Sequence, residues 1–111
     1  MKILFVASEH SPYAQVGGLS QAVSFLSRAV GKLGEDVRLF IPKYGVIDAR
    51  TYPMKLDMEK LSVPTFVKKN PKLPTELICN VLIRDTDPLY PPTYFLENRE
   101  YYELRANVYG Y

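Results

Sequence analysis

The stretch Gln15-Val16-Gly17-Gly18-Leu19 decides the fold, because it lies between two segments of different character. Before it runs Lys2-Ile3-Leu4-Phe5-Val6-Ala7, an almost unbroken apolar run typical of a strand buried on both faces of a parallel sheet. After it, an amphipathic segment extends to Leu33. In open α/β sheets, ligands bind beyond the carboxyl ends of the strands, where these two glycines are expected. Glycine lets the backbone approach a ligand closely, and a helix N-terminus offers free N–H groups to an anion.

The segment from Leu19 to Leu33 is predicted to be a helix that joins two strands. Lys32 would lie in its last turn, where a cation suits the helix dipole, and Gly34 suits a left-handed cap. The second strand is predicted at 37–41, ended by Pro42, which gives a β-α-β unit with a right-handed crossover. The apolar residues of the helix recur in steps of three and four, so they form one stripe: Leu19, Ala22, Val23, Leu26, Val30 and Leu33.

The second half of the chain has a weaker pattern. Residues 43–58 show no clear period and are interpreted as a long connection. Two alternating runs, 60–67 and 77–84, predict an antiparallel hairpin that leaves the main sheet, with Pro64 on its outer strand. A short strand at 93–96 is expected to return to the main sheet, and 97–104 to form a helical turn.

Composition limits the classes of protein. The 111 residues suggest one domain at most, and a net charge of +2 with scattered basic residues gives no argument for nucleic acid binding. No run is long enough for a membrane span. Cys79 is the only cysteine, so no internal disulfide can form, which fits the cytoplasm; it is expected to be a packed core thiol. His10, the only histidine, is expected in a surface or loop role rather than in catalysis.

The predicted elements leave one face of the sheet bare. Only one long helix is available, whereas parallel sheets are covered on both faces. We therefore expect either self-association with a partner surface or a chain that forms the front part of a longer protein.

Several segments, in this order, resemble the amino terminus of bacterial glycogen synthases and plant starch synthases. They are Lys2-Ile3-Leu4-Phe5-Val6-Ala7-Ser8-Glu9, Gly17-Gly18-Leu19 with its helix, Leu33-Gly34-Glu35-Asp36-Val37-Arg38, Ile41-Pro42-Lys43-Tyr44, and Tyr94 to Tyr102 with Tyr109-Gly110-Tyr111. The resemblance covers residues 1–111. It implies an α/β fold, in which the chain is a partial Rossmann-like domain: the front part of the N-terminal lobe of a two-lobed GT-B glycosyltransferase.

The resemblance also implies an activity and its substrates. The family transfers glucose from ADP-glucose, or sometimes UDP-glucose, to the non-reducing end of an α-1,4-glucan with retention, and it requires no metal or cofactor. Gly17 and Gly18 match the family's donor loop, and Glu9 matches its strand-end glutamate. Gln15 stands where the family has a lysine expected to meet the donor phosphates, and Gln21 stands where it has an acidic residue near the sugar. The substrate-binding candidates are thus Glu9, Gln15, Gly17 and Gly18, and no catalytic residue is assigned.

Two alternatives to an enzyme fragment are compatible with a chain of this length. Because both loop charges are missing, the chain could be a stand-alone, non-catalytic module that binds a nucleotide, a glucan or another subunit. A small flavodoxin-like or receiver-like domain is disfavoured, because the chain lacks a repeated β-α pattern and the acidic cluster of such domains. Tyr101, Tyr102, Tyr109 and Tyr111 could stack on glucan rings, but packing beneath a loop is favoured.

Overall fold

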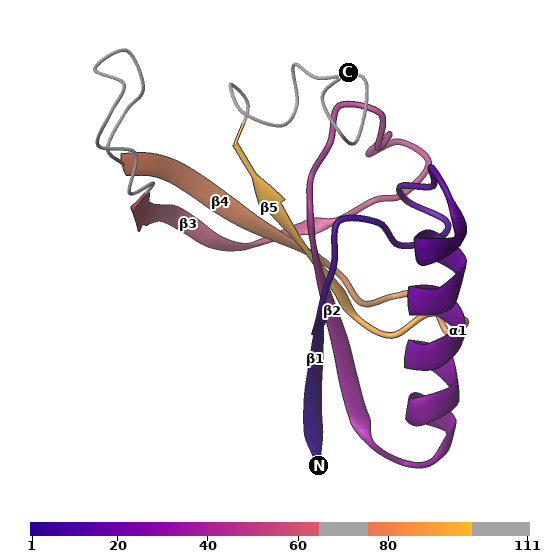
Figure 1. Cartoon of the computed structure of the whole chain (residues 1–111). Helices are drawn as coiled ribbons and strands as arrows, with labels where there is room; N and C mark the ends of the chain where they lie inside the picture. The colour runs from indigo at the N-terminus through magenta and orange to yellow at the C-terminus, as the bar shows by residue number, and fades with distance from the viewer. Residues whose placement is uncertain (65–75, 99–111) are drawn as a thin grey trace.

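The computed structural model describes residues 1–64 and 76–98, which form one mixed sheet with a single helix against it (Figure 1). Strands β1, β2 and β5 are parallel, and β4 and β3 extend the sheet antiparallel, in the order β1-β2-β5-β4-β3. This confirms the α/β class and the β-α-β unit. The elements are β1 (Lys2–Val6), α1 (Gly18–Lys32), β2 (Asp36–Pro42), β3 (Lys55–Pro64), β4 (Glu76–Arg84) and β5 (Thr93–Glu97).

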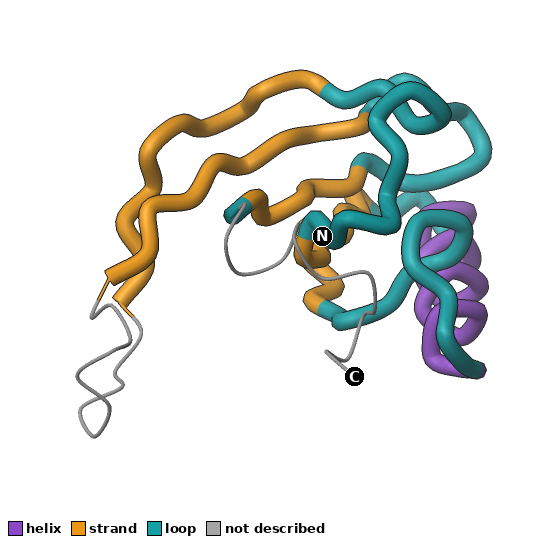
Figure 2. The backbone as a smooth tube through the Cα atoms, turned by 90° about the horizontal axis from the view of Figure 1, so that it is seen from above, coloured by secondary structure: helices purple, strands orange, loops and turns teal. Residues whose placement is uncertain are grey.

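The predicted hairpin exists, but it does not leave the main sheet. β4 pairs with β3 on one side and with β5 on the other, so the five strands are continuous (Figure 2). β3 also begins at Lys55, which corrects the prediction that 43–58 lacks regular structure. The reason is that β3 is a mostly exposed edge strand, so burial did not impose a clear alternation on its sequence.

Irregular pairing in β3 explains why its pattern was hard to detect. The register shifts between Leu56 and Met58 and again between Met58 and Leu61. Lys60 has a φ of 53°, and its N–H donates to Asn80 Oδ1 at 3.1 Å. An extra residue in one strand is a β-bulge, which breaks a period of two.

Helix α1 begins one residue before its predicted start and buries only part of its predicted stripe. Its buried residues are Ser20, Val23, Ser24 and Ser27. Val23 belongs to the predicted stripe, but Leu19, Leu26 and Leu33 of the same stripe are exposed. Small serine side chains let α1 lie close to β2, and they leave the larger apolar residues facing outward. At its end, Gly34 has a φ of +94°, which confirms the left-handed cap.

Strand β1 is an edge strand among the described residues, not a strand buried on both faces. It pairs only with β2, and 56% of Leu4 and 72% of Val6 are exposed. The register places Leu4 and Val6 on the same face as Arg38 and Phe40. Figure 1 shows α1 along one side of β1 and β2. Leu39, which alternates with Arg38 and Phe40 along β2, is buried, so the exposed Leu4 and Val6 lie on the other face. In the described part of the chain, one face of the parallel region is therefore uncovered, as the single helix predicted.

The core lies over the carboxyl ends of β2 and β5. Two loops cover Ile41 and Phe95 there, and the ring of Tyr13 stacks edge-on against Phe95 at 5.1 Å between centroids. Cys79 is buried, which confirms the packed thiol, and burial raises its pKa. The core cluster consists of Tyr13, Ala14, Ile41, Tyr44, Ile47 and Phe95.

Some predictions fall outside the described residues. These are the end of the outer hairpin strand at 65–67, the helical turn beyond 98 and the four tyrosines Tyr101, Tyr102, Tyr109 and Tyr111. Glu97, the predicted start of that turn, belongs to β5. None of the helices in the described ranges is long and apolar enough to cross a bilayer.

Candidate functional site

The loop that follows β1 folds back on itself before it enters α1. The N–H groups of His10 and Ala14 each donate to the other's carbonyl oxygen, at 3.1 and 2.9 Å. The N–H of Ser11 donates to the carbonyl oxygen of Ser20 at 3.1 Å, which fastens the turn to the helix. The hydroxyl of Tyr44, after β2, donates to the carbonyl oxygen of Ser8 at 3.0 Å. These bonds hold the loop at the carboxyl ends of the parallel strands.

Glu9 shapes the glycine loop from beneath. Its side chain is 2% exposed, and Oε1 accepts hydrogen bonds from the N–H groups of Val16 at 2.7 Å and Gly17 at 2.9 Å. A carboxylate that accepts two backbone N–H groups fixes their direction strongly. These contacts make Glu9 a support for the loop, and its predicted role in substrate binding stays a prediction. They also use two N–H groups that could otherwise have bound an anion.

Gly17 and Gly18 border open space. Gly17 is the N-cap of α1 in an extended conformation, and Gly18 is its first helical residue. A Cβ atom added at either position would meet no atom within 4 Å. Neither the backbone conformation nor the described neighbours therefore require glycine here. A remaining physical reason for glycine at both positions is that a group outside the described residues comes close to the backbone there.

The first turn of α1 has N–H groups that could donate hydrogen bonds to a bound group. The four N-terminal N–H groups of a helix have no partner within it. In the described part of the chain, no acceptor is found for the N–H groups of Gly18 and Leu19. The hydroxyl of Ser20 donates to the carbonyl oxygen of Gly17 at 2.8 Å, which tightens this turn. The loop thus presents helix-terminal donors to solvent.

Gln15 and Gln21 are both exposed, and they lie on either side of the glycines. The amide of Gln15 donates to the carbonyl oxygen of Pro12 at 3.4 Å, a long contact that leaves the side chain free to turn outward. All five residues from Gln15 to Leu19 are exposed, so the structure brings the predicted loop together on an open surface. This geometry fits one wall of a site.

His10 lies in the loop after β1, which agrees with the loop alternative of its predicted surface or loop role, but it is not at the surface. It is fully buried, and neither ring nitrogen has a partner among the described residues. Its ring lies 5.4 Å from that of Tyr13 and 6.2 Å from that of Tyr90, between centroids. Burial lowers the pKa of His10 from 6.5 to about 4, so the imidazole is neutral at pH 7. A lone histidine in a polar loop sequence gave no periodic signal for this burial.

Lys43 and Tyr44, after β2, were not predicted as part of this region. Both are buried, and Tyr44 helps to hold the loop after β1. The sequence feature that could have indicated them is the segment Ile41-Pro42-Lys43-Tyr44, which belongs to the resemblance to glycogen and starch synthases. Within the described ranges, no group of three or more histidine, cysteine, aspartate or glutamate side chains could hold a metal ion.

Comparison with known proteins decides the family. The profile of the starch synthase catalytic domain matches residues 2–111. The chain belongs to the starch synthase catalytic domain family. It is 34% identical over 112 residues to a glycogen synthase of Geotalea uraniireducens, a match that covers 99% of this chain and 21% of the relative. It is 31% identical over 111 residues to a glycogen synthase of Anoxybacillus flavithermus, covering 100% of this chain and 21% of that relative.

Similarity is concentrated in part of the chain. Over 47 residues, 42% of this chain and 10% of the relative, it is 55% identical to glycogen synthase 1 of Synechocystis. The chain spans about a fifth of the length of the first two relatives. Its fold resembles the catalytic domain of starch synthase IV from Arabidopsis thaliana, solved with ADP and acarbose, with a TM-score of 0.63 at 23% identity over 86% of this chain and 18% of that one. The chain thus corresponds to the N-terminal portion of the starch synthase catalytic domain, and its mixed sheet with one helix matches that part of the GT-B fold.

Proposed function

We propose that this starch synthase family chain supplies the donor-side wall of a glycogen or starch synthase active site. The complete enzyme would act in the cytoplasm. It would transfer glucose from ADP-glucose, with UDP-glucose as the alternative donor, to the non-reducing end of an α-1,4-glucan with retention. The observation that supports this most is the exposed loop from Gln15 to Leu19, with its open space at Gly17 and Gly18 and its support by Glu9.

The chain's own residues would bind and orient the donor rather than react with it. The N–H groups of Gly18 and Leu19 would donate to a donor phosphate, aided by the positive end of α1. Glu9 would keep the loop in position for that contact. The chemical step needs charged groups around the reacting centre, and within this loop both expected charges are replaced by Gln15 and Gln21.

The test of the donor assignment is Gln15→Lys in a polypeptide that carries both lobes. A positive charge at about 4 Å from a phosphate is worth roughly 4 kcal/mol at an effective dielectric of 20, while a hydrogen bond to a charged group contributes about 1.5–3 kcal/mol. The net gain in binding free energy should be smaller than the full charge interaction, because lysine replaces the hydrogen bond of Gln15. We expect Gln15→Lys to tighten ADP-glucose binding about tenfold, or about 1.4 kcal/mol, and Gln15→Ala to weaken it. Calorimetric titration at low salt measures both, and unchanged affinity in both variants rejects the assignment.

The rival function is a stand-alone module that binds a nucleotide or a glucan without catalysis. The neutral residues Gln15 and Gln21 favour it. The two functions are separated by assaying glucan elongation from ADP-glucose with the two-lobed polypeptide: elongation supports the enzyme. Binding of ADP-glucose or a maltooligosaccharide without any elongation supports the module. The 111-residue chain alone is expected to show no transfer.

A further inference from the structure

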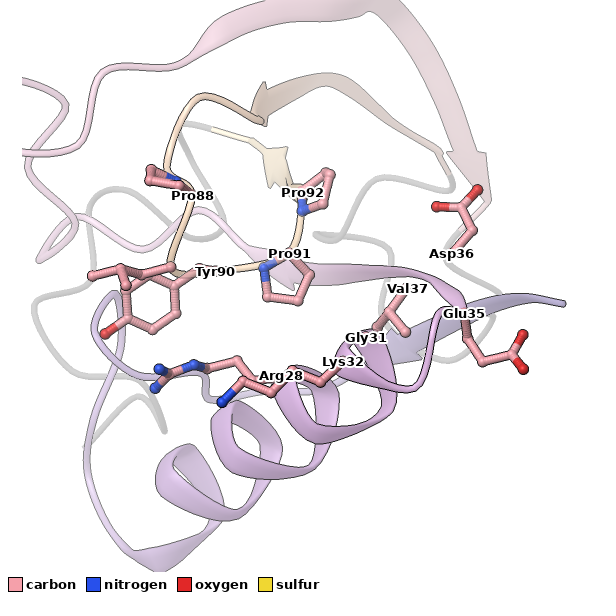
Figure 3. Close-up of a pocket in the computed structure, with 11 residues that line it drawn as sticks. Arg28, Gly31, Lys32, Glu35, Asp36, Val37, Pro88, Tyr90, Pro91 and Pro92 are labelled. Carbon is pink, nitrogen blue, oxygen red and sulfur yellow. The ribbon is translucent and has the colours of Figure 1, made fainter.

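A second site lies along the C-terminal half of α1, where the helix faces the loop between β4 and β5. The pocket there has a volume of about 500 Å³, within the range of small-molecule sites. Arg28 and Lys32 of α1 form one wall, and Tyr90, Pro91 and Pro92 form the other (Figure 3). Gly18 and Arg28 are ten residues apart on α1, or roughly 15 Å at the helical rise, so the glycine loop is not part of this pocket.

Two cations on this wall have no carboxylate partner in the part of the chain that the structure describes. Arg28 and Lys32 are four residues apart, so they are neighbours on one face of the helix. Figure 3 shows both side chains extending in the same direction along α1, toward the Tyr90 side of the pocket. Among the described residues, no ion pair involves either of them. Two like charges held together are stabilised by an anion placed between them and the opposite wall.

The acidic residues of the pocket are already engaged. Glu35 Oε2 lies 2.6 Å from the amino group of Met1, and Asp36 Oδ1 lies 3.7 Å from Arg38 Nε. In Figure 3 both carboxylates lie at the far end from the Tyr90 ring. Their charges are offset by these partners, so the part of the pocket near Tyr90 is the positive part.

The opposite wall is rigid and apolar. The guanidinium of Arg28 lies 5.3 Å from the centroid of the Tyr90 ring, a cation–π contact that positions it. The Tyr90 ring is itself packed against His10 and Tyr13, with centroid distances of 6.2 and 6.4 Å. Proline adds fixed apolar surface with little conformational freedom. The wall can therefore hold the flat or apolar part of a ligand while the two cations hold its charge.

We propose that this pocket binds a small phosphate monoester, with the phosphate at Arg28 and Lys32 and its organic part against Tyr90 and the prolines. Arginine and lysine are the usual phosphate ligands in proteins, and a dianion matches two cations. A volume of about 500 Å³ is larger than a phosphate ion needs, which leaves room for the organic part. The proposal does not depend on the donor assignment of the glycine loop.

The test uses the 111-residue chain labelled with ¹⁵N and titrated with phenyl phosphate, inorganic phosphate or phenol. Phenyl phosphate is expected to shift the amide resonances of Gly31, Val37 and Leu89, which line the pocket. Inorganic phosphate should bind the same residues more weakly, and phenol should bind more weakly than phenyl phosphate. Phenyl phosphate binding should weaken at least tenfold in Arg28→Gln and in Lys32→Gln.

Arg50→Gln serves as the matched control, because Arg50 is an exposed cation on a loop that does not line the pocket. Its affinity for phenyl phosphate should be unchanged, and all three variants should keep the thermal unfolding temperature of the parent to show that they fold. Equal loss in all three variants would mean attraction to net charge only and would overturn the proposal. Shifts confined to Gly18 and Leu19 would also overturn it, because the phosphate would then occupy the glycine loop.

Discussion

At the scale of single residues, Glu9 determines the shape of the glycine loop. We predict that Glu9→Ala lowers the free energy of unfolding by about 2–4 kcal/mol, because two N–H groups lose a charged acceptor worth about 1.5–3 kcal/mol each, partly replaced by water. Urea denaturation measures the loss. Glu9→Gln keeps one acceptor oxygen and should lose less.

Amide hydrogen exchange separates this role from general packing. In Glu9→Ala, exchange should accelerate at Val16 and Gly17, whose N–H groups contact Glu9, more than at Leu39 in the centre of β2. If protection falls equally at all three amides, Glu9 supports the whole fold and not the loop in particular.

His10 gives the chain a dependence on acid pH. Burial lowers the pKa of His10 to about 4 in the folded chain, against 6.5 in the unfolded chain, so protonation favours unfolding. The contribution of neutral His10 to the free energy of unfolding is fully present above pH 6.5 and is lost as the pH falls through 4. The difference between the two pKa values corresponds to about 3 kcal/mol.

We predict that His10→Phe removes this part of the pH dependence. Phenylalanine keeps a ring against Tyr13 and Tyr90 and has no nitrogen to protonate. The measurement is the difference in unfolding free energy between parent and variant at pH 7 and pH 4.5, in which the contributions of the carboxylates cancel. A difference that does not change with pH would show that His10 has the same pKa in the folded and unfolded chains, and that burial does not lower it.

At the scale of elements, α1 is expected to tolerate changes on its exposed face better than on its buried face. Val23 is 9% exposed and Phe25 is 67% exposed. Val23→Ala removes buried methyl groups worth about 0.8 kcal/mol each, so we predict a loss of about 1–2 kcal/mol in unfolding free energy. Phe25→Ala, the matched control, should change it by less than about 0.5 kcal/mol. The opposite order in chemical denaturation would show that α1 buries the face that carries Phe25 in solution.

The sequence predicted the elements that depend on strong local signals. The parallel β1-α1-β2 unit has an apolar run, a helical period and Gly34 at the cap, and each was found within one or two residues of its predicted position. The predicted start of β3 lies too far along the chain, because two register shifts disrupt the alternation of its residues. The order of β4 and β5 within one sheet depends on pairing between distant segments, which no local pattern encodes.

The candidate site was predicted in part. The positions of Gly17, Gly18 and Gln15 on an exposed loop agree with the sequence argument. The inward direction of Glu9 and the burial of His10 could not be read from residue types, because both depend on how the loop folds over the core. The pocket beside Tyr90 was missed, because it brings together residues 28–37 and 88–92.

At the scale of the whole molecule, the uncovered sheet face predicts association. Leu4 and Val6 are exposed beside Phe40, and exposed apolar surface of this kind favours contact with another surface. We predict that the 111-residue chain self-associates and that Val6→Lys shifts it toward the monomer, as measured by sedimentation velocity. Val46→Lys, a matched change at another exposed valine outside the strands, should have little effect. A compact, stable monomer of the parent chain would refute this prediction.

The right-handed crossover rule specifies which face of the sheet would carry the connection to a strand added at the free edge of β1. From β1 to β2 the chain moves one way across the sheet, with α1 on one face. A chain that ran from β5 back past β1 would move the other way, so a right-handed connection would have to cross the opposite, bare face. The direction of winding would then reverse between β1 and the new strand. Such a reversal opens a crevice at the carboxyl end of the strands, the topological switch point where ligands of doubly wound sheets bind. The loop held by Glu9, which follows β1, would then lie at the edge of that crevice.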